Sequence, residues 1–322
     1  MSKNKDKEIK VIFESPNRRP YASKIAMILG EGLEIGFDGE ACLLTEEKCI
    51  VRISPDKEKT KKDGKTLQKL NATIEGFTTA SEAEQMGFKL SLALLWSAVS
   101  RKWPLKLDYH TPKPCMVYNR TQSGGSFHVV ASGSLHLRDD PKTVTKLINQ
   151  ILSKKKDVDP KLLISMELFT SARLESTERT RFVGLVSSLE PLASQESYNN
   201  QEIDDLVKKF IGQLSNITSI NNNIKNSIAG RARELCNESI SQSIVKLVEK
   251  YIPDNPKVVK SVTEAYKIRS AILHDGTSDT DLDEKSNELE DIIRYIYGKI
   301  LELPLLVAPT NFERLLKTRA EH

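Results

Sequence analysis

The sequence predicts an α+β protein, with a mixed α/β N-terminal domain over residues 1–157 and an all-α domain over residues 158–322. Three observations lead to this prediction. The chain of 322 residues exceeds the usual size of a single hydrophobic core. Short runs in the first half alternate between apolar and polar residues, as strands do. Apolar residues in the second half instead recur at helical spacing. We therefore expect a small antiparallel sheet, or more than one, followed by a helical bundle.

The first strands are indicated by residues 7–14, "KEIKVIFE", and residues 48–54, "KCIVRIS". Between them, Asp38-Gly39 separates two short apolar runs, which is a hairpin signal. The polar segment 55–65, "PDKEKTKKDGK", then interrupts the pattern. We expect this segment to be a mobile loop.

A strand predicted at residues 70–77 leads into the clearest helix of the first half. Thr79 and Glu82 have the spacing of a capping box, and apolar residues follow on one helical face. These residues are Ala83, Met86, Leu90, Ala93 and Leu94. We expect this helix to lie across the sheet.

More strands are predicted at 103–109, 115–121 and 126–138, the last two joined at Gly124-Gly125, and Asp140-Pro141 begins another helix. Beyond Asp157 every apolar pattern is helical. The stripes are Phe182, Leu185, Val186, Leu189 and Leu192, and the segments 203–214, 243–252 and 289–303. No repeat of 20 to 50 residues is evident, which favours a bundle over a solenoid.

Charge is divided unevenly along the chain. Residues 1–157 carry 27 Lys and Arg against 19 Asp and Glu, whereas residues 158–322 carry 21 against 25. A basic half suits a polyanionic partner, although a solvated lysine-rich surface gives the same count. No run approaches the roughly 18 apolar residues of a membrane span, and no apolar stretch follows the charged start. We expect a cytoplasmic protein with no membrane partner.

Several local motifs fail on their spacing. The four cysteines, Cys42, Cys49, Cys115 and Cys236, stand singly, so neither a zinc site nor a disulfide framework is indicated, and we expect no metal and no cofactor. "DGKT" at 63–66 has lysine where a phosphate-binding loop needs its leading glycine. "SGGS" at 123–126 is explained better by a turn. His110, His128 and His136 have no carboxylate or cysteine at metal spacing.

The segment 264–276, "EAYKIRSAILHDG", is different because it ends a helix. The apolar spacing predicts a helix from about residue 256 to 274, with Pro256 in its first turn and Gly276 as its terminating residue. His274 then lies in the last turn, where unpaired carbonyls favour a cation and support proton transfer. A favourable capping histidine is the alternative. Five positions separate Arg269 from His274, so they point roughly 140° apart at about 100° per residue. One helix therefore cannot easily bring both groups to one phosphate. A strained terminal turn could narrow the angle, or a second copy of the helix could supply the missing groups and complete a composite site.

An Arg followed by four to six residues and a His, late in an all-α bundle, resembles the signature of HEPN domains. The tract "RFVGLVSSLEPLA" at 181–193 is similar to the second-helix region of the Apea-like HEPN group, and the resemblance covers about residues 158–303. Two positions depart from the pattern: Asp275 is inserted before the Gly that commonly follows the His, and Ser270 is smaller than the usual polar residue.

The resemblance implies a metal-independent endoribonuclease that acts as a homodimer or higher oligomer, often in antiphage defence or toxin systems. Its catalytic residues would be Arg269 and His274. Glu190 would orient the Arg or the His, although a solvent-facing glutamate is the alternative. Ser270 and Asp275 would assist in positioning, although a structural role is the alternative for each. Charge alone suggests RNA contacts at Lys267, Arg231 and Arg233, which could equally be a solvated helix face.

Two other functions stay open. The helical domain could be a dimerisation or RNA-binding module that does not cleave. Alternatively, the N-terminal domain could be the working part, which senses a trigger or regulatory protein or a nucleic acid while the bundle assembles it.

Overall fold

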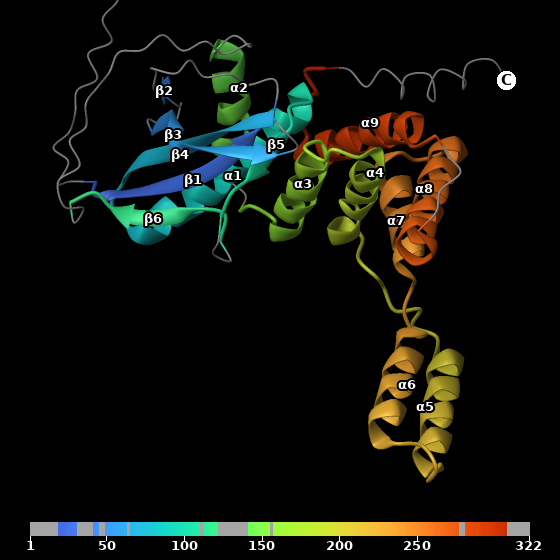
Figure 1. Ribbon diagram of the computed structural model, residues 1–322. Helices are drawn as coiled ribbons and strands as arrows, with labels where there is room; N and C mark the ends of the chain where they lie inside the picture. Colours follow the sequence, from blue (N-terminus) through green and yellow to red (C-terminus); the bar gives the residue numbers. More distant parts are fainter. Residues whose placement is uncertain are drawn as a thin grey trace, which may run out of the picture. The chain divides into compact units, whose positions relative to one another are not determined.

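The computed structural model describes residues 19–30, 41–44, 49–62, 65–109, 113–121, 141–154, 157–276 and 281–307. The chain divides into two compact units. The first comprises Met1–Ala98 and Trp103–Val158, and the second comprises Val99–Lys102 and Asp159–His322. A small antiparallel sheet belongs to the first unit and most helices follow it in sequence, which confirms the α+β fold (Figure 1). Among the described residues, no helix combines the length and apolar character needed to cross a bilayer.

Six strands of the first unit form one sheet within the described part of the chain. They are β1 (Tyr21–Leu29), β2 (Ala41–Leu44), β3 (Ile50–Lys62), β4 (Lys65–Phe77), β5 (Leu105–Leu107) and β6 (Met116–Asn119). Their order is β2-β3-β4-β1-β5, with β6 also paired to β1, and every pairing is antiparallel. The strands predicted at 70–77, 103–109 and 115–121 are confirmed, as is the one at 48–54.

β1 pairs with three other strands, yet it is absent from the strands that the sequence pattern predicts. It pairs with β4 along one edge and with β5 and β6 along the other. Alternate residues Ile25, Met27 and Leu29 are buried, which is the period of a strand with one covered face. The strand predicted at 7–14, the turn at Asp38-Gly39, the segment 122–140 and His110 lie outside the described residues.

The prediction of a mobile loop at 55–65 is wrong. β3 runs to Lys62 and β4 begins at Lys65, and these two residues are paired. A register shift between Pro55 and Lys59 interrupts the ladder. The polar composition misled the prediction because backbone hydrogen bonds hold a ladder together whatever its side chains are. The Asp63-Gly64 dipeptide between the strands carried a hairpin signal that the prediction overlooked.

Helix α1 (Ala80–Arg101) begins at the predicted capping box. The Glu82 backbone N–H donates to Thr79 Oγ1 at 3.2 Å, and the Thr79 N–H donates back to the Glu82 carboxylate at 3.3 Å. The helix packs on β1, as predicted. The Ser23 hydroxyl of β1 donates a hydrogen bond to the Ala83 carbonyl in the first turn of α1. A Cβ at Gly87 would lie 2.6 Å from Cys115 Sγ and 2.8 Å from Ser23 Cβ. Glycine therefore permits the close approach of helix and sheet.

The second half of α1 is buried on every side, whereas the sequence predicted one apolar face. All residues from Leu90 to Ser100 are buried. The Ser91 and Ser97 hydroxyls donate to carbonyls one turn earlier, at 3.0 and 2.8 Å, so their burial leaves no unpaired group. Helix α2 (Pro141–Leu152) follows where Asp140-Pro141 predicts a helix start.

Helices make up the second unit. They are α3 (Pro160–Ala172), α4 (Glu178–Ser187), the short 3-10 helix η2 (Glu190–Leu192), α5 (Gln201–Asn216), α6 (Asn222–Glu234), α7 (Ile240–Tyr251), α8 (Pro256–Asp275) and α9 (Leu282–Leu301). α4 packs against α3, α8 and α9, and α7 packs against α8 and α9. Phe169 and Tyr297 meet edge to face in this core, with ring centroids 5.6 Å apart. The helical segments predicted at 203–214, 243–252 and 289–303 are confirmed.

Three charged residues of helix α9 are buried, although the apolar pattern of the sequence did not predict their burial. Glu290, Asp291 and Arg294 are at most 2% exposed. Arg294 pairs with Asp291 at 3.1 Å and donates to the carbonyls of Val99 and Val307 at 2.8 and 2.7 Å. Burial lowers the pKa of Arg294, and the nearby carboxylates oppose that shift.

Glu290 joins the neighbouring helices through further charges. Arg173 donates to one of its carboxylate oxygens, and Arg181 lies 3.2 Å from the other. Lys102 lies 3.0 Å from Asp291. These contacts satisfy carboxylates that would otherwise be costly to bury.

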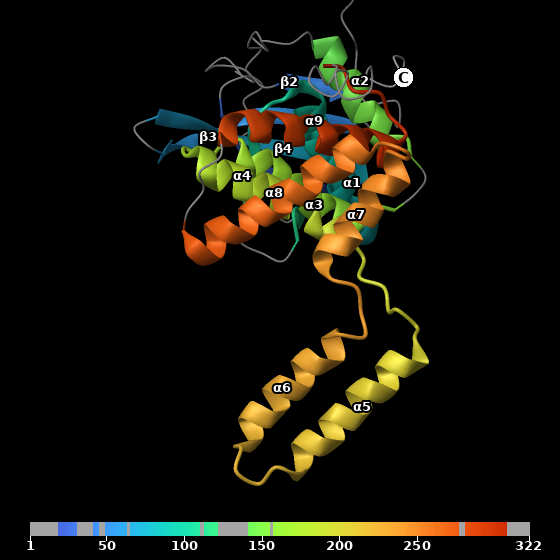
Figure 2. The same ribbon diagram turned by 90° about the vertical axis from the view of Figure 1, so that its right-hand side faces the viewer.

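Helices α5 and α6 pair with each other, and both views draw them apart from the other helices of this unit (Figures 1 and 2). The chain enters and leaves this pair through two short antiparallel segments. Tyr198 N donates to the Cys236 carbonyl at 3.0 Å, and Glu238 N donates to the Glu196 carbonyl at 2.9 Å. We refer to residues 199–235 as the α5–α6 arm.

Candidate functional site

The ends of helix α8 confirm the boundaries that the sequence predicts. Pro256 is its first residue, and the Asn255 side chain accepts a hydrogen bond from Val258 N at 3.2 Å. Gly276 ends the helix with φ of 72°, in the left-handed region. The last turn therefore contains His274, as expected from sequence.

Arg269 lies next to Glu190. One Nη atom of Arg269 is 3.0 Å from Glu190 Oε1, and the two side chains are 20% and 27% exposed. Glu190 Oε1 has no aligned hydrogen-bond donor, so the contact is a close charge pair and not a well-formed hydrogen bond. The Arg269 guanidinium also lies 5.8 Å from the centre of the Tyr266 ring, one turn earlier on α8. Partial burial with two neighbours limits the orientations of this side chain.

Arg269 and His274 do not meet on one chain. α8 is a continuous α-helix through Asp275, so five residues still place the two side chains roughly 140° apart. His274 and Asp275 are exposed, and Ser270 is half-buried on the same helix. The chain therefore presents a partly buried arginine and a solvent-exposed histidine on different faces of one helix.

The residues proposed for RNA contact are divided between two places. Lys267 is exposed on α8, two residues from Arg269. Arg231 and Arg233 are exposed in the last turn of α6, which packs against α5. Both views draw α6 away from α8, so the structure does not bring these two arginines to Arg269 (Figures 1 and 2).

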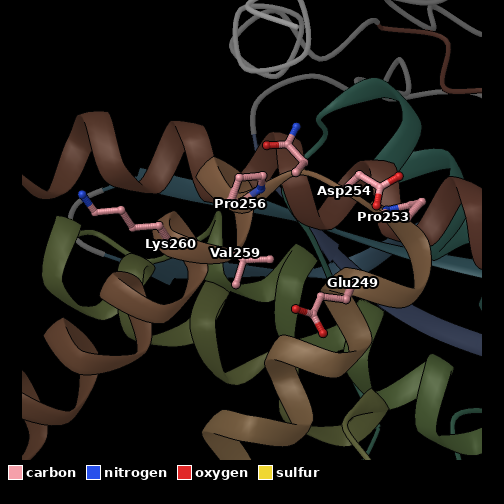
Figure 3. A pocket seen from close by; sticks show the side chains of 7 residues that line it. Glu249, Pro253, Asp254, Pro256, Val259 and Lys260 are labelled. Atoms are coloured by element: carbon pink, nitrogen blue, oxygen red, sulfur yellow. The ribbon is translucent and has the colours of Figure 1, made fainter.

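A cavity of about 560 Å³ lies at the turn between α7 and α8 (Figure 3). This is the first turn of α8, whereas His274 is in its last turn. It is lined by Glu249, Pro253, Asp254, Asn255, Pro256, Val259 and Lys260. None of these is a predicted site residue. The cavity is thus separate from the Arg269 and His274 site.

Metal-ligating side chains do not gather in the described ranges: no group of three His, Cys, Asp or Glu residues there could hold a metal ion. Cys49, Cys115 and Cys236 are free thiols. Burial is the main cause that raises the pKa of Cys115 to about 11, which keeps this thiol neutral and unreactive near pH 7.

One feature of the site has no place in the sequence predictions. Tyr266 supports the guanidinium, and the signal for it was its position three residues before Arg269 on a helix. The pairing of Glu190 with Arg269 joins residues 79 positions apart, so no local pattern shows it, but the family resemblance named Glu190 as the residue that would orient the Arg or the His. Compared with protein-family models, curated proteins and solved structures, the chain has no match in any of the three.

Proposed function

We propose that the protein is a metal-independent endoribonuclease of the HEPN type, active as a homodimer, whose composite site contains Arg269 and His274 from both copies. The observation that carries the proposal is the arrangement at the end of α8. There, Arg269 is held by Glu190 at 3.0 Å while His274 stands exposed in the terminal turn. A histidine in solvent can exchange protons, and a held arginine can bind a phosphate with two donors.

The cleavage needs no external nucleophile because RNA supplies its own ribose 2′-hydroxyl. His274 of one copy removes the 2′-hydroxyl proton as O2′ forms a bond to the adjacent phosphorus. The phosphorus–O5′ bond breaks, and the partner subunit's His274 donates a proton to the leaving O5′. The products are a 2′,3′-cyclic phosphate and a 5′-hydroxyl. Arg269 stabilises the charge that develops on the phosphate oxygens.

Other residues have supporting roles in this proposal. Glu190 orients Arg269, and Ser270 and Asp275 position the helix end that carries His274. Lys267 extends the basic surface beside the site and contacts the RNA backbone. Arg233, in the last turn of α6, contacts RNA away from this surface. The first unit senses a trigger or regulatory partner, in keeping with a role in antiphage defence or as a toxin.

The proposal is tested by incubating purified full-length protein with total RNA in EDTA. His274→Ala and Arg269→Ala are compared with wild type, and the fragment ends are identified. Wild type should produce 2′,3′-cyclic phosphate and 5′-hydroxyl ends, and each variant should lose this activity by at least about 100-fold. Lys260→Ala is the matched control, since this side chain is 78% exposed at the other end of α8. Activity retained in either site variant overturns the assignment.

The same experiment addresses a non-catalytic role. If wild type binds RNA and assembles normally but leaves the RNA intact, the helical unit is a binding or dimerisation module. If wild type does cleave RNA, binding of the trigger by a variant that no longer cleaves would assign sensing to a different part of the chain.

A further inference from the structure

Helix α5 buries only one edge of its apolar surface. Val207 and Leu214 are buried in the pair with α6. Leu206 and Phe210, one turn apart, remain 68% and 46% exposed. These two residues are neighbours of the buried row, so the apolar arc of α5 is wider than the surface that α6 covers.

Helix α6 has the same arrangement. Ala229 and Ala232 are buried against α5. Ile224 and Leu235 are 55% and 66% exposed, and they flank the buried alanines along one side of the helix. Alanine at the contact leaves the larger apolar side chains of α6 outside it.

The two exposed rows lie on the same broad face of the arm. On α5 the exposed row is displaced by about 70° in the negative sense from the buried row, at 100° per residue, and on α6 by about 100° in the same sense. Antiparallel helices that face each other and deviate in the same sense point their deviating rows to one side. We call Leu206, Phe210, Ile224 and Leu235 the apolar face of the arm.

Opposite charges border this face at one end. Glu202 lies one turn before Leu206 on α5, and Arg231 lies one turn before Leu235 on α6. The first turn of α5 and the last turn of α6 are at the same end of an antiparallel pair. Within the described part of the chain, neither charge forms an ion pair.

We propose that the apolar face of the arm binds the same face of a second copy. A two-fold axis parallel to the helices places each α5 on the partner's α6, which completes a four-helix bundle with antiparallel neighbours. The same axis brings the Glu202 side chain of each copy next to the partner's Arg231. Stacking α5 on the partner's α5 would instead leave these charges unmatched.

The size of the face sets the expected affinity. A helix of 16 residues is about 24 Å long, and two adjacent helices are roughly 20 Å wide. The face therefore covers about 500 Å² per copy, or about 1,000 Å² for the pair, which is near the lower limit for a specific interface. We expect a dimer that forms reversibly over a micromolar range of concentration.

This inference deepens the proposed function and rests on it only in that a composite site needs two copies. Assembly and cleavage are measured separately. A dimer that cuts no RNA would overturn the proposed function and leave the interface intact. RNA cleavage by a protein whose dimer does not depend on the arm would overturn the interface and leave the proposed function intact.

The test is sedimentation velocity of the full-length protein from about 1 to 100 µM, a range that spans the expected affinity. Leu206→Glu buries a charge in the interface twice, once per copy, so it should raise the dimer dissociation constant at least about tenfold. Lys208→Glu is the matched control, because it lies on the opposite side of α5 and is 73% exposed. A monomeric wild type, or a Leu206→Glu dimer of unchanged affinity, refutes the interface.

Charge exchange tests the orientation. Glu202→Arg and Arg231→Glu should each weaken the dimer, and the double variant should regain most of the lost affinity because the pairs reform with reversed sign. Unchanged folding of each variant is checked by circular dichroism. A double variant that is weaker than both single variants excludes this arrangement.

Discussion

Glu190, at the start of η2, lies 3.0 Å from Arg269, which is more than three turns along α8, so one charge pair joins the two segments of the proposed site. η2 follows α4 directly, and α4 packs against α8. The core contacts of α4 thereby fix where Glu190 meets the arginine. Arg269 owes its orientation to a residue that need not touch RNA.

Glu190→Gln should lower the RNA cleavage rate by roughly 10- to 100-fold, because the neutral amide holds the guanidinium less firmly and small misplacements are costly. The effect should fall on kcat more than on KM, and Glu190→Asp should restore part of the rate. Single-turnover cleavage measures both. Glu264→Gln, another acid on α8 with an exposed side chain that pairs with Lys260, should leave the rate unchanged. Equal losses in both variants would show that Glu190 has no specific role.

Arg294→Met should reduce the free energy of unfolding of the second unit by about 3–5 kcal/mol. Methionine fills similar space but leaves the carbonyls of Val99 and Val307 without this donor and removes the arginine partner of buried Asp291. Urea unfolding followed by circular dichroism measures the loss. Lys208→Met removes an exposed pair, with Asp205 at 3.8 Å, and should change the same quantity by less than about 0.5 kcal/mol. A loss below about 1 kcal/mol for Arg294→Met would contradict this account of the buried charges.

Gly87→Ala and Gly230→Ala should have opposite effects on stability. Both positions are helical, but a Cβ at Gly87 would lie 2.8 Å from Ser23 Cβ, whereas nothing lies within 4 Å of one at Gly230. Gly87→Ala should destabilise by about 1–2 kcal/mol, because overpacking exceeds the gain in helix propensity. Gly230→Ala should stabilise by up to about 1 kcal/mol. Thermal unfolding of both variants measures the difference, and a stabilising Gly87→Ala would show that helix and sheet separate readily.

Local signals predicted the parts of the fold that depend on neighbouring residues. The capping box at Thr79 and Glu82 and the glycine stop at Gly276 are set within one turn of chain, so the helix boundaries they define are confirmed. Tertiary context decided the rest. The polar segments of β3 and β4 are paired through their backbone hydrogen bonds, and their amino-acid composition does not indicate this pairing. Glu290, Asp291 and Arg294 are buried because several helices supply counter-charges and carbonyls.

In the candidate site, too, local spacing predicted one part and tertiary packing decided the other. The spacing of Arg269 and His274 shows from sequence alone that they diverge on a helix, and the continuity of α8 keeps this geometry. That Glu190 is the neighbour of Arg269 depends on how η2 packs near α8, so only the family resemblance, and no local spacing, could suggest it. Arg231 and Arg233 were grouped with Lys267 by charge, yet they belong to another helix pair, since charge gives no position in space.

The paired segments at the base of the α5–α6 arm make it an insertion whose two ends adjoin. The hydrogen bond from Tyr198 N to the Cys236 carbonyl holds the entering and leaving chain side by side. Whole turns can be added to or removed from both helices, about 5.4 Å at a time, without redirecting the chain on either side. The arm is in this respect a spacer of adjustable length, and its reach can change in evolution or by engineering while the end of α8 stays as it is.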